Sequence, residues 1–565
     1  SLIETGALIK QTSEWELRTT GAGEVPEVLE RLIRSRVDRL PAPARETIVA
    51  ASVLGGEFSV PALRAVMGVN GELPGILGQL CASGLLREVG NMPGSVYRFR
   101  HALIQEATYK GLLRSERRQL HARAAWGLEA ASADRMEEVA AVLGHHYASA
   151  GEMERAVHHL EVAGDHAAAA FANDEAVSSY RYALALADED EGPDGPARAR
   201  VRLRQKLASV HLRTGKHAEA RAGLHEAIAI VGDQDSLKAA QLQSALGRVE
   251  TADHEYQAAV AAFDAADELV GPNPEHQDQA SVDIWLEVQL EGRANLHYWR
   301  NEPDRAAEVL ERAAPVVEAR GTAAQRQSFH WSTAGRQLRE SRYRVDEGTL
   351  AHLRAAEQAG RETGDEQAAS WTIFTLGFGL LWHGDFEAAE KLLSEALATA
   401  DRVGDLVLRA RCLCYLNVAA LRRHDTKRVR ALAPEALLAG ETAKYPEYVA
   451  AAKATMAWVA WHEGREDDVV ALSDEAMQVW AACVVSYSWY SLCLFPLLAL
   501  HLRHGRVADA AAISRQLLAP PQVRLADEVE ALLASGSDLW DAGEAERAAA
   551  DLTRAVDLAI ELHFT

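Results

Sequence analysis

The stretch YRFRHALIQEATY, residues 97–109, places one histidine, His101, where a short β-hairpin is predicted to pass into a helix. The two strands of that hairpin are predicted at residues 85–89 and 95–99. The second strand runs into the start of the quoted stretch. The residues between them, Gly90, Asn91, Pro93 and Gly94, are typical of a tight turn. We therefore expect a hairpin that leads directly into a helix at His101.

Three helices are predicted before this hairpin. Apolar residues recur at helical spacing from Ala44 to Leu54, and Ser59 can cap a short helix from Val60 to Met67. A third helix is expected from about Glu72 to Ser83. Three helices and a hairpin wing indicate a winged-helix domain, which we place at residues 41–113.

A winged helix commonly binds DNA through its third helix, which enters the major groove. Here that helix reads ELPGILGQLCAS, and it offers no Arg or Lys to contact bases. The whole chain carries a formal net charge of -23, which opposes contact with phosphates. We therefore predict no direct binding of nucleic acid.

Four segments in the first third of the chain resemble the region after the nucleotide-binding core in the STAND class of signalling ATPases. They are VPEVLERLIRSRVDRLP (25–41), AASVLGGEFSVPALRAV (50–66), FRHALIQEATYKGLL (99–113) and RRQLHARAAWGLE (117–129). The chain is most similar to large bacterial members that join the ATPase core to helical repeats, some fused to a nucleotide cyclase and others to a LuxR-type DNA-binding end. The resemblance implies that residues 1–40 are the end of the ATPase's helical lid, and that the chain is a C-terminal piece of a longer protein.

The resemblance also implies a role for His101. In this family a His at this place in the winged helix contacts the β-phosphate of bound ADP and holds a closed resting state. The usual motif is Met-His-Asp, whereas Arg100 and Ala102 flank His101, so the contribution of the Asp is missing. An imidazole can donate a hydrogen bond to a phosphate oxygen, which gives the role a physical basis. The alternative is a structural role at the corner between hairpin and helix.

The ATPase core itself is not evident in the sequence. A phosphate-binding loop needs the pattern G-x-x-x-x-G-K-[ST], whereas the Gly215-Lys216 pair is followed by His217 and lacks the earlier Gly. No G-x-S-x-G, H-E-x-x-H or Cys-rich metal spacing is present either. We therefore predict that this chain is not an enzyme and holds no metal, although its parent protein is an ATPase that can be fused to a nucleotide cyclase. ADP or ATP would bind only together with the missing core.

Beyond residue 113 the sequence repeats. Six sites share a Gly, a small or β-branched residue five positions later, and Ala or Leu seven positions after that. They are Gly151/Ala156/Ala163, Gly215/Ala220/Ala227, Gly384/Ala389/Ala396, Gly464/Val469/Ala476, Gly505/Ala510/Leu517 and Gly543/Ala548/Ala555. Each indicates a helix–turn–helix unit in which Gly adopts the turn conformation and the small residues allow close helix packing.

The units are longer than tetratricopeptide repeats (TPRs), which have about 34 residues. Gly464, Gly505 and Gly543 are 41 and 38 residues apart, and His424 replaces the Gly in a weaker unit. The acidic stretch DEDEGPDGP (188–196) is the best internal boundary. We predict a helical connector with the first TPR-like repeat at residues 114–190 and a TPR-like α-solenoid at residues 191–565. The predicted fold class is thus all-α, a winged helix followed by a superhelix of helix pairs.

Composition agrees with a helical protein of this size. The sequence is 48% hydrophobic and 25% charged, a composition typical of globular proteins. Its 565 residues are more than one compact core normally holds. No apolar run reaches the roughly 18 residues that span a bilayer, so we predict no membrane contact and a cytoplasmic location. Cys412 and Cys414 fall in one predicted helix with side chains that point apart, which favours free buried thiols over a metal site.

Stacking would turn the first helices of the repeats into one concave wall. Counting back from the turn residues places seven aromatic side chains on or near that wall: Tyr298, Trp331, Trp371, Phe374, Phe378, Trp458 and Trp461. Such a lining suits a sugar, an apolar effector or an extended peptide. The alternative is that these rings pack neighbouring helices together, as aromatic residues at helical spacing commonly do.

Together, the residues and the resemblance predict the sensor and coupling arm of a bacterial STAND-type signalling ATPase. The winged helix would hold the ADP-bound resting state, and the repeats would bind an effector or partner protein. The upstream ATPase domain and a homo-oligomer formed on activation are the other expected partners. Two alternatives stay open: a TPR scaffold for protein–protein interaction without nucleotide control, and part of a LuxR-type transcriptional activator.

Overall fold

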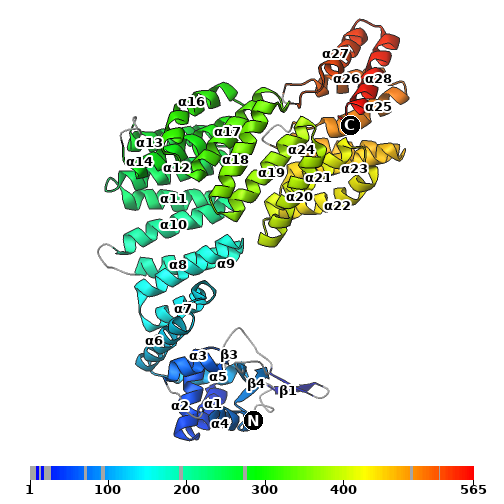
Figure 1. The fold of residues 1–565 in the computed structure, drawn as a ribbon. Helices are drawn as coiled ribbons and strands as arrows, with labels where there is room; N and C mark the ends of the chain where they lie inside the picture. The colour runs from blue at the N-terminus through cyan, green and yellow to red at the C-terminus, as the bar shows by residue number, and fades with distance from the viewer. Residues whose placement is uncertain are drawn as a thin grey trace. The chain divides into compact units, whose positions relative to one another are not determined.

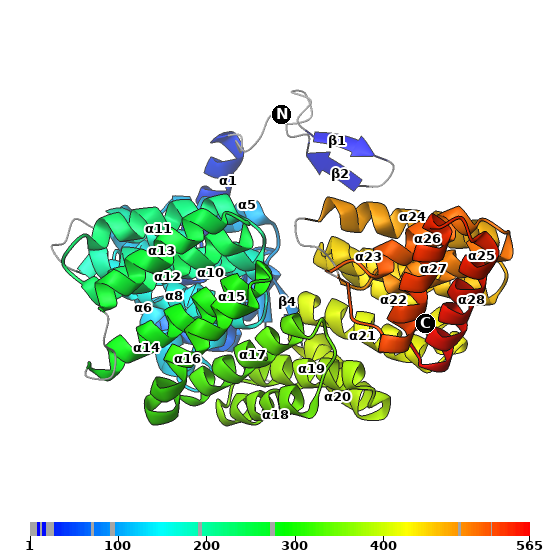
Figure 2. The same ribbon diagram turned by 90° about the horizontal axis from the view of Figure 1, so that it is seen from above.

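The computed structural model describes residues 8–11, 14–17, 27–68, 73–90, 96–189, 195–271, 277–483, 488–520 and 522–565. The chain divides into two compact units, Ser1–Leu207 and Ala208–Thr565 (Figures 1 and 2). Helices make up most of each unit.

The first residues that the structure describes form a β-ribbon rather than a helix. Strands β1 (Leu8–Gln11) and β2 (Glu14–Leu17) pair in antiparallel fashion, and helix α1 (Glu27–Asp38) follows. The helical lid expected over residues 1–40 is therefore wrong for residues 8–17. Ile9 and Trp15 favour extended backbone, and the register of the ribbon pairs Leu8 with Leu17.

The next segment contains the predicted helices and hairpin. Its elements are α2 (Ala42–Val53), β3 (Glu57–Ser59), α3 (Val60–Met67), α4 (Leu73–Ala82), β4 (Leu86–Gly90), β5 (Val96–Phe99) and α5 (Ala102–Lys110). The strands form one antiparallel sheet in the order β3-β5-β4, and β3 was not predicted. Glu72 and the predicted turn residues 91–94 lie outside the described residues. The winged-helix assignment rests on this order of elements and stays a prediction.

Apolar side chains from every helix of this segment meet under the sheet. Ile48, Leu63, Leu77 and Leu86 are at most 1% exposed and belong to one core. The predicted cap of α3 is confirmed, because the Ser59 hydroxyl accepts a hydrogen bond from the backbone N–H of Ala62 at 3.3 Å. This core holds the junction between β5 and α5 in place.

Repeated helices follow in the rest of the first unit and across its boundary. They are α6 (Arg114–Ala131), α7 (Met136–Ala150), α8 (Met153–Ala169), α9 (Asn173–Glu189) and α10 (Gly195–Arg213). The compact units divide inside α10, whereas the sequence placed the boundary at residues 190–191. The early part of α10 stays with α8 because Arg202 donates two hydrogen bonds to Glu161, at 2.7 and 2.8 Å.

Two buried histidines join α6 to α7. The Nδ1 atoms of His121 and His146 are 2.8 Å apart, so one ring donates and the other accepts a hydrogen bond. The hydroxyl of Tyr109, from α5, lies 2.9 Å from Nε2 of His121. Burial lowers the pKa of His121 to about 3 and that of His146 to about 4, so both rings are neutral at pH 7.

The second unit is an all-α, TPR-like solenoid. Its helices are α11 (His217–Val231), α12 (Ser236–Ala252), α13 (Tyr256–Val270), α14 (Gln279–Glu287), the π-helix η2 (Val288–Ala294), α15 (Asn295–Trp299), α16 (Pro303–Arg320), α17 (Ala323–Glu340), α18 (Glu347–Glu362), α19 (Glu366–His383), α20 (Phe386–Val403), α21 (Leu406–Arg422), α22 (Thr426–Ala443), α23 (Pro446–His462), α24 (Glu466–Ala482), α25 (Ser491–Arg503), α26 (Val507–Leu517), α27 (Asp527–Asp541) and α28 (Ala545–Glu561). Successive helices pack side by side, as α17 to α20 show in Figures 1 and 2. Among the described residues, no helix combines the length and apolarity that crossing a bilayer requires.

The turn inside each helix pair uses left-handed backbone. The predicted turn glycines adopt it, with φ of 102° at Gly384 and 71° at Gly464. Weaker repeats place residues with side chains there instead, with φ of 62° at His254, 56° at Asn301 and 57° at His424. The predicted replacement of the turn Gly by His424 is confirmed.

Candidate binding face of the repeats

A layer of aromatic rings runs across the first helices of three successive repeats, α17, α19 and α21. The ring centroids of Trp331 and Trp371 are 5.9 Å apart, and those of Trp371 and Phe374 are 5.4 Å apart. Phe378 then contacts Tyr415 at 4.8 Å. Residues 371, 374 and 378 are spaced by three and four positions, which places them along one side of α19.

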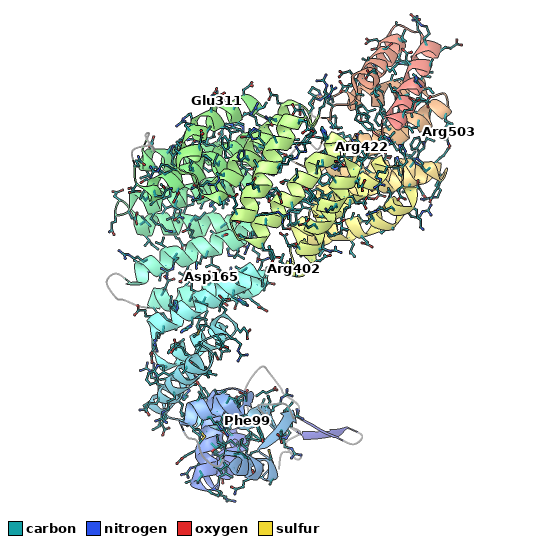
Figure 3. The ribbon with its side chains drawn as sticks, viewed as in Figure 1. Phe99, Asp165, Glu311, Arg402, Arg422 and Arg503 are labelled. Atoms are coloured by element: carbon teal, nitrogen blue, oxygen red, sulfur yellow. The ribbon has the colours of Figure 1, made fainter. Side chains whose placement is uncertain are left out.

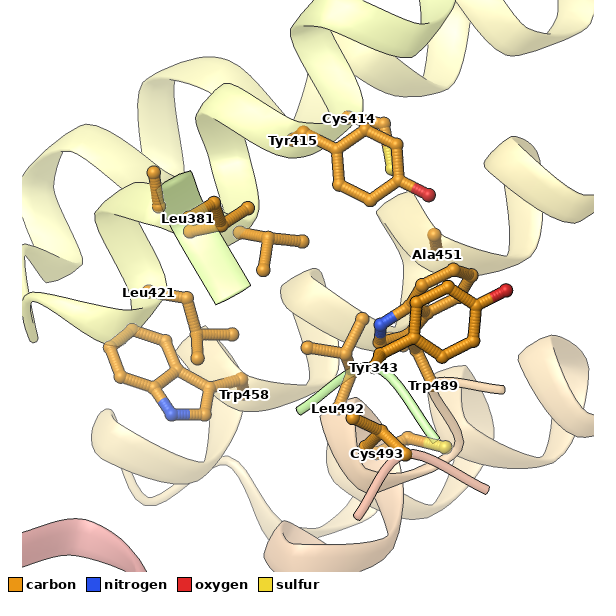
Figure 4. Close-up of a cluster of buried hydrophobic side chains, with 14 of the residues drawn as sticks. Tyr343, Leu381, Cys414, Tyr415, Leu421, Ala451, Trp458, Trp489, Leu492 and Cys493 are labelled. Carbon is orange, nitrogen blue, oxygen red and sulfur yellow. The ribbon is translucent and has the colours of Figure 1, made fainter. Parts of the chain in front are cut away.

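Trp489 covers the centre of this layer. It lies between α24 and α25, and only 7% of its surface is exposed. Its ring centroid is 4.9 Å from that of Tyr343 and 5.9 Å from that of Tyr415 (Figure 4). It is 5.6 Å from the ring centroid of Trp382. These distances are typical of favourable aromatic pairs. The middle of the predicted binding face is therefore occupied by a side chain of the protein itself.

Two short stretches of chain, residues 488–490 and 522–525, hold Trp489 there, and we call them the closing segments. The backbone N–H of Arg524 donates to the carbonyl of Arg342 at 2.8 Å. In return, Nε of Arg342 donates to the carbonyl of Gln522 at 2.8 Å. Because Arg342 belongs to the turn between α17 and α18, the closing segments tie the far end of the unit to the aromatic layer.

The seven aromatic residues predicted for the wall do not share one environment. Phe374 and Phe378 are buried in the layer, at 5% and 7% exposure, and Trp331 and Trp371 are half-buried beside them. Half-buried Tyr298 meets the same layer at its end, since its hydroxyl lies 3.4 Å from that of Tyr343.

The other two predicted residues lie in α23, away from these contacts. Trp461 is half-buried and packs against the core, with its ring 4.8 Å from that of His462. Trp458 is 0% exposed, so its predicted place on an open wall is wrong. Its ring packs inward because Leu421 and other core residues surround it (Figure 4). For the layer as a whole, the alternative that these rings pack neighbouring helices describes the structure better.

The sequence reasoning missed Tyr343, Trp382, Tyr415 and Trp489, which complete the layer. Trp489 belongs to the run SYSWY (486–490), which falls between two repeats rather than inside one. An aromatic-rich connection of this kind was the available signal, because connections between repeats are usually short and polar.

Arginine side chains lie over the rings at the edges of the layer. The guanidinium carbon of Arg339 is 4.3 Å from the ring centroid of Tyr298, and that of Arg411 is 4.7 Å from that of Trp371. Burial raises the pKa of Tyr343 well above its ordinary value, so its phenol stays protonated at neutral pH. The face thus combines apolar rings with cationic edges, a chemistry that suits aromatic or acidic groups of a ligand.

His101 lies apart from this face, in the first unit. It is the residue that precedes the first turn of α5, with extended backbone, and its side chain is exposed. The imidazole makes no capping hydrogen bond to α5, so the structural alternative of a helix cap is not what the structure shows.

The remaining prediction about binding chemistry concerned metals. Cys412 and Cys414 are buried thiols in α21. Within the part of the chain that the structure describes, no group of three or more His, Cys, Asp or Glu side chains could hold a metal ion.

Comparison with known proteins gives likeness in fold rather than a family. No protein family model matches the chain. An uncharacterized protein of Rhizobium meliloti (strain 1021) is 39% identical over 97 residues, which cover 17% of this chain and 9% of that protein. Among solved structures, a STAND protein with a tetratricopeptide repeat sensor from Pyrococcus horikoshii is similar with a TM-score of 0.48 and 13% identity, over 81% of this chain and 66% of that one. Aspartyl phosphate phosphatase F from Bacillus subtilis is similar with a TM-score of 0.41 and 11% identity, over 70% of this chain and 97% of that one.

Proposed function

We propose that this chain is the sensor and coupling arm of a STAND-type signalling ATPase, and that its repeats bind an effector or partner protein. The observation that carries the proposal is the aromatic layer covered by Trp489. A ligand that takes the place of Trp489 converts a closed face into an open one, so the repeats have two states between which a ligand can choose.

The coupling part of the proposal rests on the resemblance and on His101. The exposed imidazole at the start of α5 has no capping role that would occupy it. It is therefore able to donate to a phosphate oxygen of ADP held by an upstream ATPase domain. In this scheme the chain contributes no catalytic group. Effector binding at the repeats favours opening of the winged helix, exchange of nucleotide and assembly of protomers.

The test is native mass spectrometry of the protein with and without the upstream ATPase segment. We expect ADP to be retained only when that segment is present, and His101→Ala to abolish the retention. His145→Ala is the matched control, because His145 is also exposed and lies on α7. Equal retention of ADP by the His101→Ala protein would contradict the role of His101.

A scaffold without nucleotide control is the second candidate function, and the same experiment distinguishes it from the sensor and coupling arm. If neither form of the protein carries nucleotide while the repeats alone retain a partner protein, the scaffold is the better account. The third candidate, part of a LuxR-type activator, requires a DNA-binding domain elsewhere in the reading frame.

A further inference from the structure

Arg422, the last residue of α21, is a buried cation among aromatic rings. Figure 3 labels its position in the second unit. Arg422 is 7% exposed, and its guanidinium carbon lies 4.8 Å from the ring centroid of Phe564, 5.3 Å from that of Trp382 and 5.7 Å from that of Phe386. These rings come from α19, α20 and the residues after α28. The charge is thus enclosed by three elements of the second unit.

Among the side chains that the structure describes, none supplies a counter-charge to Arg422. Across the described ranges Arg422 forms no ion pair, and its Nε atom is enclosed without any hydrogen-bond partner. Burial lowers the pKa of Arg422 to about 10, which still leaves the guanidinium charged at neutral pH. A buried charge is normally paired, because removing it from water costs far more than a neutral group does.

The carboxylates of the adjacent turns are engaged elsewhere. Glu390 pairs with Arg423 at 3.0 Å and also with Arg428. Asp385 accepts a hydrogen bond from the backbone N–H of Ala388 and so caps α20. Asp425 caps α22 in the same way. None of these groups is placed to neutralise Arg422.

Two further donors are also enclosed without a partner, and the first belongs to a ring that lies beside Arg422. They are the indole Nε1 of Trp382 and the hydroxyl of Thr565, which follows Phe564 in the chain. Buried donors in folded proteins nearly always have an acceptor. The unpartnered Nε of Arg422 and Nε1 of the neighbouring Trp382 indicate that an acceptor with negative charge belongs beside them.

We propose that Arg422 binds the carboxylate of a small organic acid whose apolar body, aromatic or branched, lies against Trp382, Phe386 and Phe564. A carboxylate accepts two parallel hydrogen bonds from a guanidinium, and the indole N–H is a further donor. Of the guanidinium nitrogens only Nε is fully enclosed, so Nη1 and Nη2 are the donors that this guanidinium would offer to the carboxylate.

The site favours a carboxylate over a phosphate because it holds one fixed charge. The imidazole of His424, two residues after Arg422, packs on that of His563, with ring centroids 5.0 Å apart. Burial lowers the pKa of His424, so this ring adds no positive charge at neutral pH. One guanidinium balances a monoanion, whereas a phosphate carries up to two charges.

Trp382 connects this site to the candidate binding face. Its ring contacts Arg422 and also stacks on Trp489, at a centroid distance of 5.6 Å and an interplanar angle of 27°. An acid bound at Arg422 therefore restrains Trp382 and, through it, the side chain that covers the aromatic layer. The inference does not depend on nucleotide control, because every residue involved belongs to the repeats.

Binding is tested on the purified chain by calorimetric titration and thermal unfolding with phenylacetate, indole-3-acetate and isovalerate as probes. We expect at least one acid to bind and raise the unfolding temperature, whereas the neutral analogue phenylacetamide and inorganic phosphate do not. Arg422→Met should weaken binding more than about tenfold, as expected for loss of a charge-assisted pair. Arg423→Met is the matched control, because Arg423 is the next residue, exposed and paired with Glu390.

Three results would overturn the proposal. They are no binding by any of the three acids, equal binding of phenylacetamide and phenylacetate, and unchanged acid binding by the Arg422→Met protein. Binding of phosphate but of no carboxylate would overturn the assigned ligand class. Arg422→Gln is the second variant if Arg422→Met fails to fold, and its circular dichroism spectrum is compared with that of the Arg423→Met protein.

Discussion

Two stretches of the second unit stack the same kind of helix pair through different contacts. Helices α11 to α15 are joined by ion pairs, such as Arg221 with Glu250 at 2.7 Å and Arg248 with Glu291 at 2.8 Å. Helices α17 to α23 are joined by rings, with Trp331 against Trp371 at 5.9 Å. The repeat backbone therefore fixes where helices lie, whereas the side chains between them decide which conditions loosen the stack.

The two kinds of contact differ in how much they contribute to stability and in how they respond to salt. Exposed ion pairs contribute about 0–1 kcal/mol each and weaken with salt, although a partly buried pair such as Arg221 with Glu250 is worth more. Each aromatic ring buries about 150–250 Å² and is insensitive to salt. The first stretch should thus be the salt-dependent one, and the second should depend on keeping its rings covered.

The largest effect is expected from Trp489→Ala. Removing the ring from the middle of the aromatic layer should lower the free energy of unfolding of the second unit by about 3–5 kcal/mol, as for other buried aromatic residues. Urea denaturation followed by circular dichroism measures the change. Trp299→Ala is the control, because Trp299 is 38% exposed. Equal losses of unfolding free energy in the two variants would show that Trp489 stabilises the unit no more than an exposed ring does.

The neutral pair of His121 and His146 is a third kind of contact, besides the ion pairs and the aromatic rings. Its contribution to stability should depend on pH between about 6.5 and 4. The pKa values of these imidazoles are lowered to about 3 and about 4, so below pH 6.5 the unfolded chain takes up protons that the folded chain refuses. Stability therefore falls as the pH drops from about 6.5 to about 4, by a few kcal/mol at about 1.4 kcal/mol per pKa unit.

Hydrogen exchange, corrected for the intrinsic pH dependence of exchange, locates this loss. We expect α6 and α7 to lose protection over that pH range, and the double variant His121→Gln/His146→Gln to remove the dependence. Uniform loss along the chain, unaffected by the double variant, would contradict the role of the pair.

Within the ion-paired stretch, Glu250→Gln should have the next largest effect. Glu250 is 5% exposed and accepts two hydrogen bonds from Arg221, each of 2.7 Å, so losing its charge should cost about 1–3 kcal/mol. The cost should shrink in 1 M salt, where the wild-type pair is itself screened. Glu308→Gln is the control, because the Arg305–Glu308 pair is exposed on both sides. A cost that is the same at every salt concentration would argue against an electrostatic role.

The smallest effect concerns the turns, which both stretches share. His254→Gly should stabilise the protein by about 0.5–1 kcal/mol, because a residue with a side chain strains left-handed backbone while Gly does not. Asn301→Gly should change stability less, since Asn tolerates that conformation. Thermal unfolding of both variants checks the order, and a loss of stability in the His254→Gly protein would contradict it.

The repeats could be predicted from the sequence because their turns and small residues are local signals. The turn at Gly384 needs a positive φ at one residue, so the presence of Gly at that position is enough to predict it. The replacement at His424 followed from the spacing of its neighbours. The β-ribbon at residues 8–17 was missed because the resemblance to a helical lid outweighed the extended preference of Ile9 and Trp15.

The candidate face could be predicted only in part. The spacing of Trp371, Phe374 and Phe378 puts them along one side of α19, because helical spacing is a local property. Their prediction as part of a binding wall stays a prediction. Their burial under Trp489 was not predictable, since it depends on chain that follows more than a hundred residues later. Arg422 gave no sequence signal either, because an Arg at the end of a helix is ordinary until its surroundings are known.

The hydrogen bond from Arg342 to Gln522 joins residues 180 positions apart, so the closing segments are among the last parts of the layer to be synthesised. At about 5–20 residues per second, a ribosome needs about 10–40 s to travel that distance. In the later part of this interval, after Tyr415 has been synthesised, the rings of Tyr343, Phe378 and Tyr415 are present while the closing segments that hold Trp489 over them are not complete. Every newly made chain therefore presents its aromatic layer to the cell once, and a chaperone or an early-binding partner has that interval in which to occupy it.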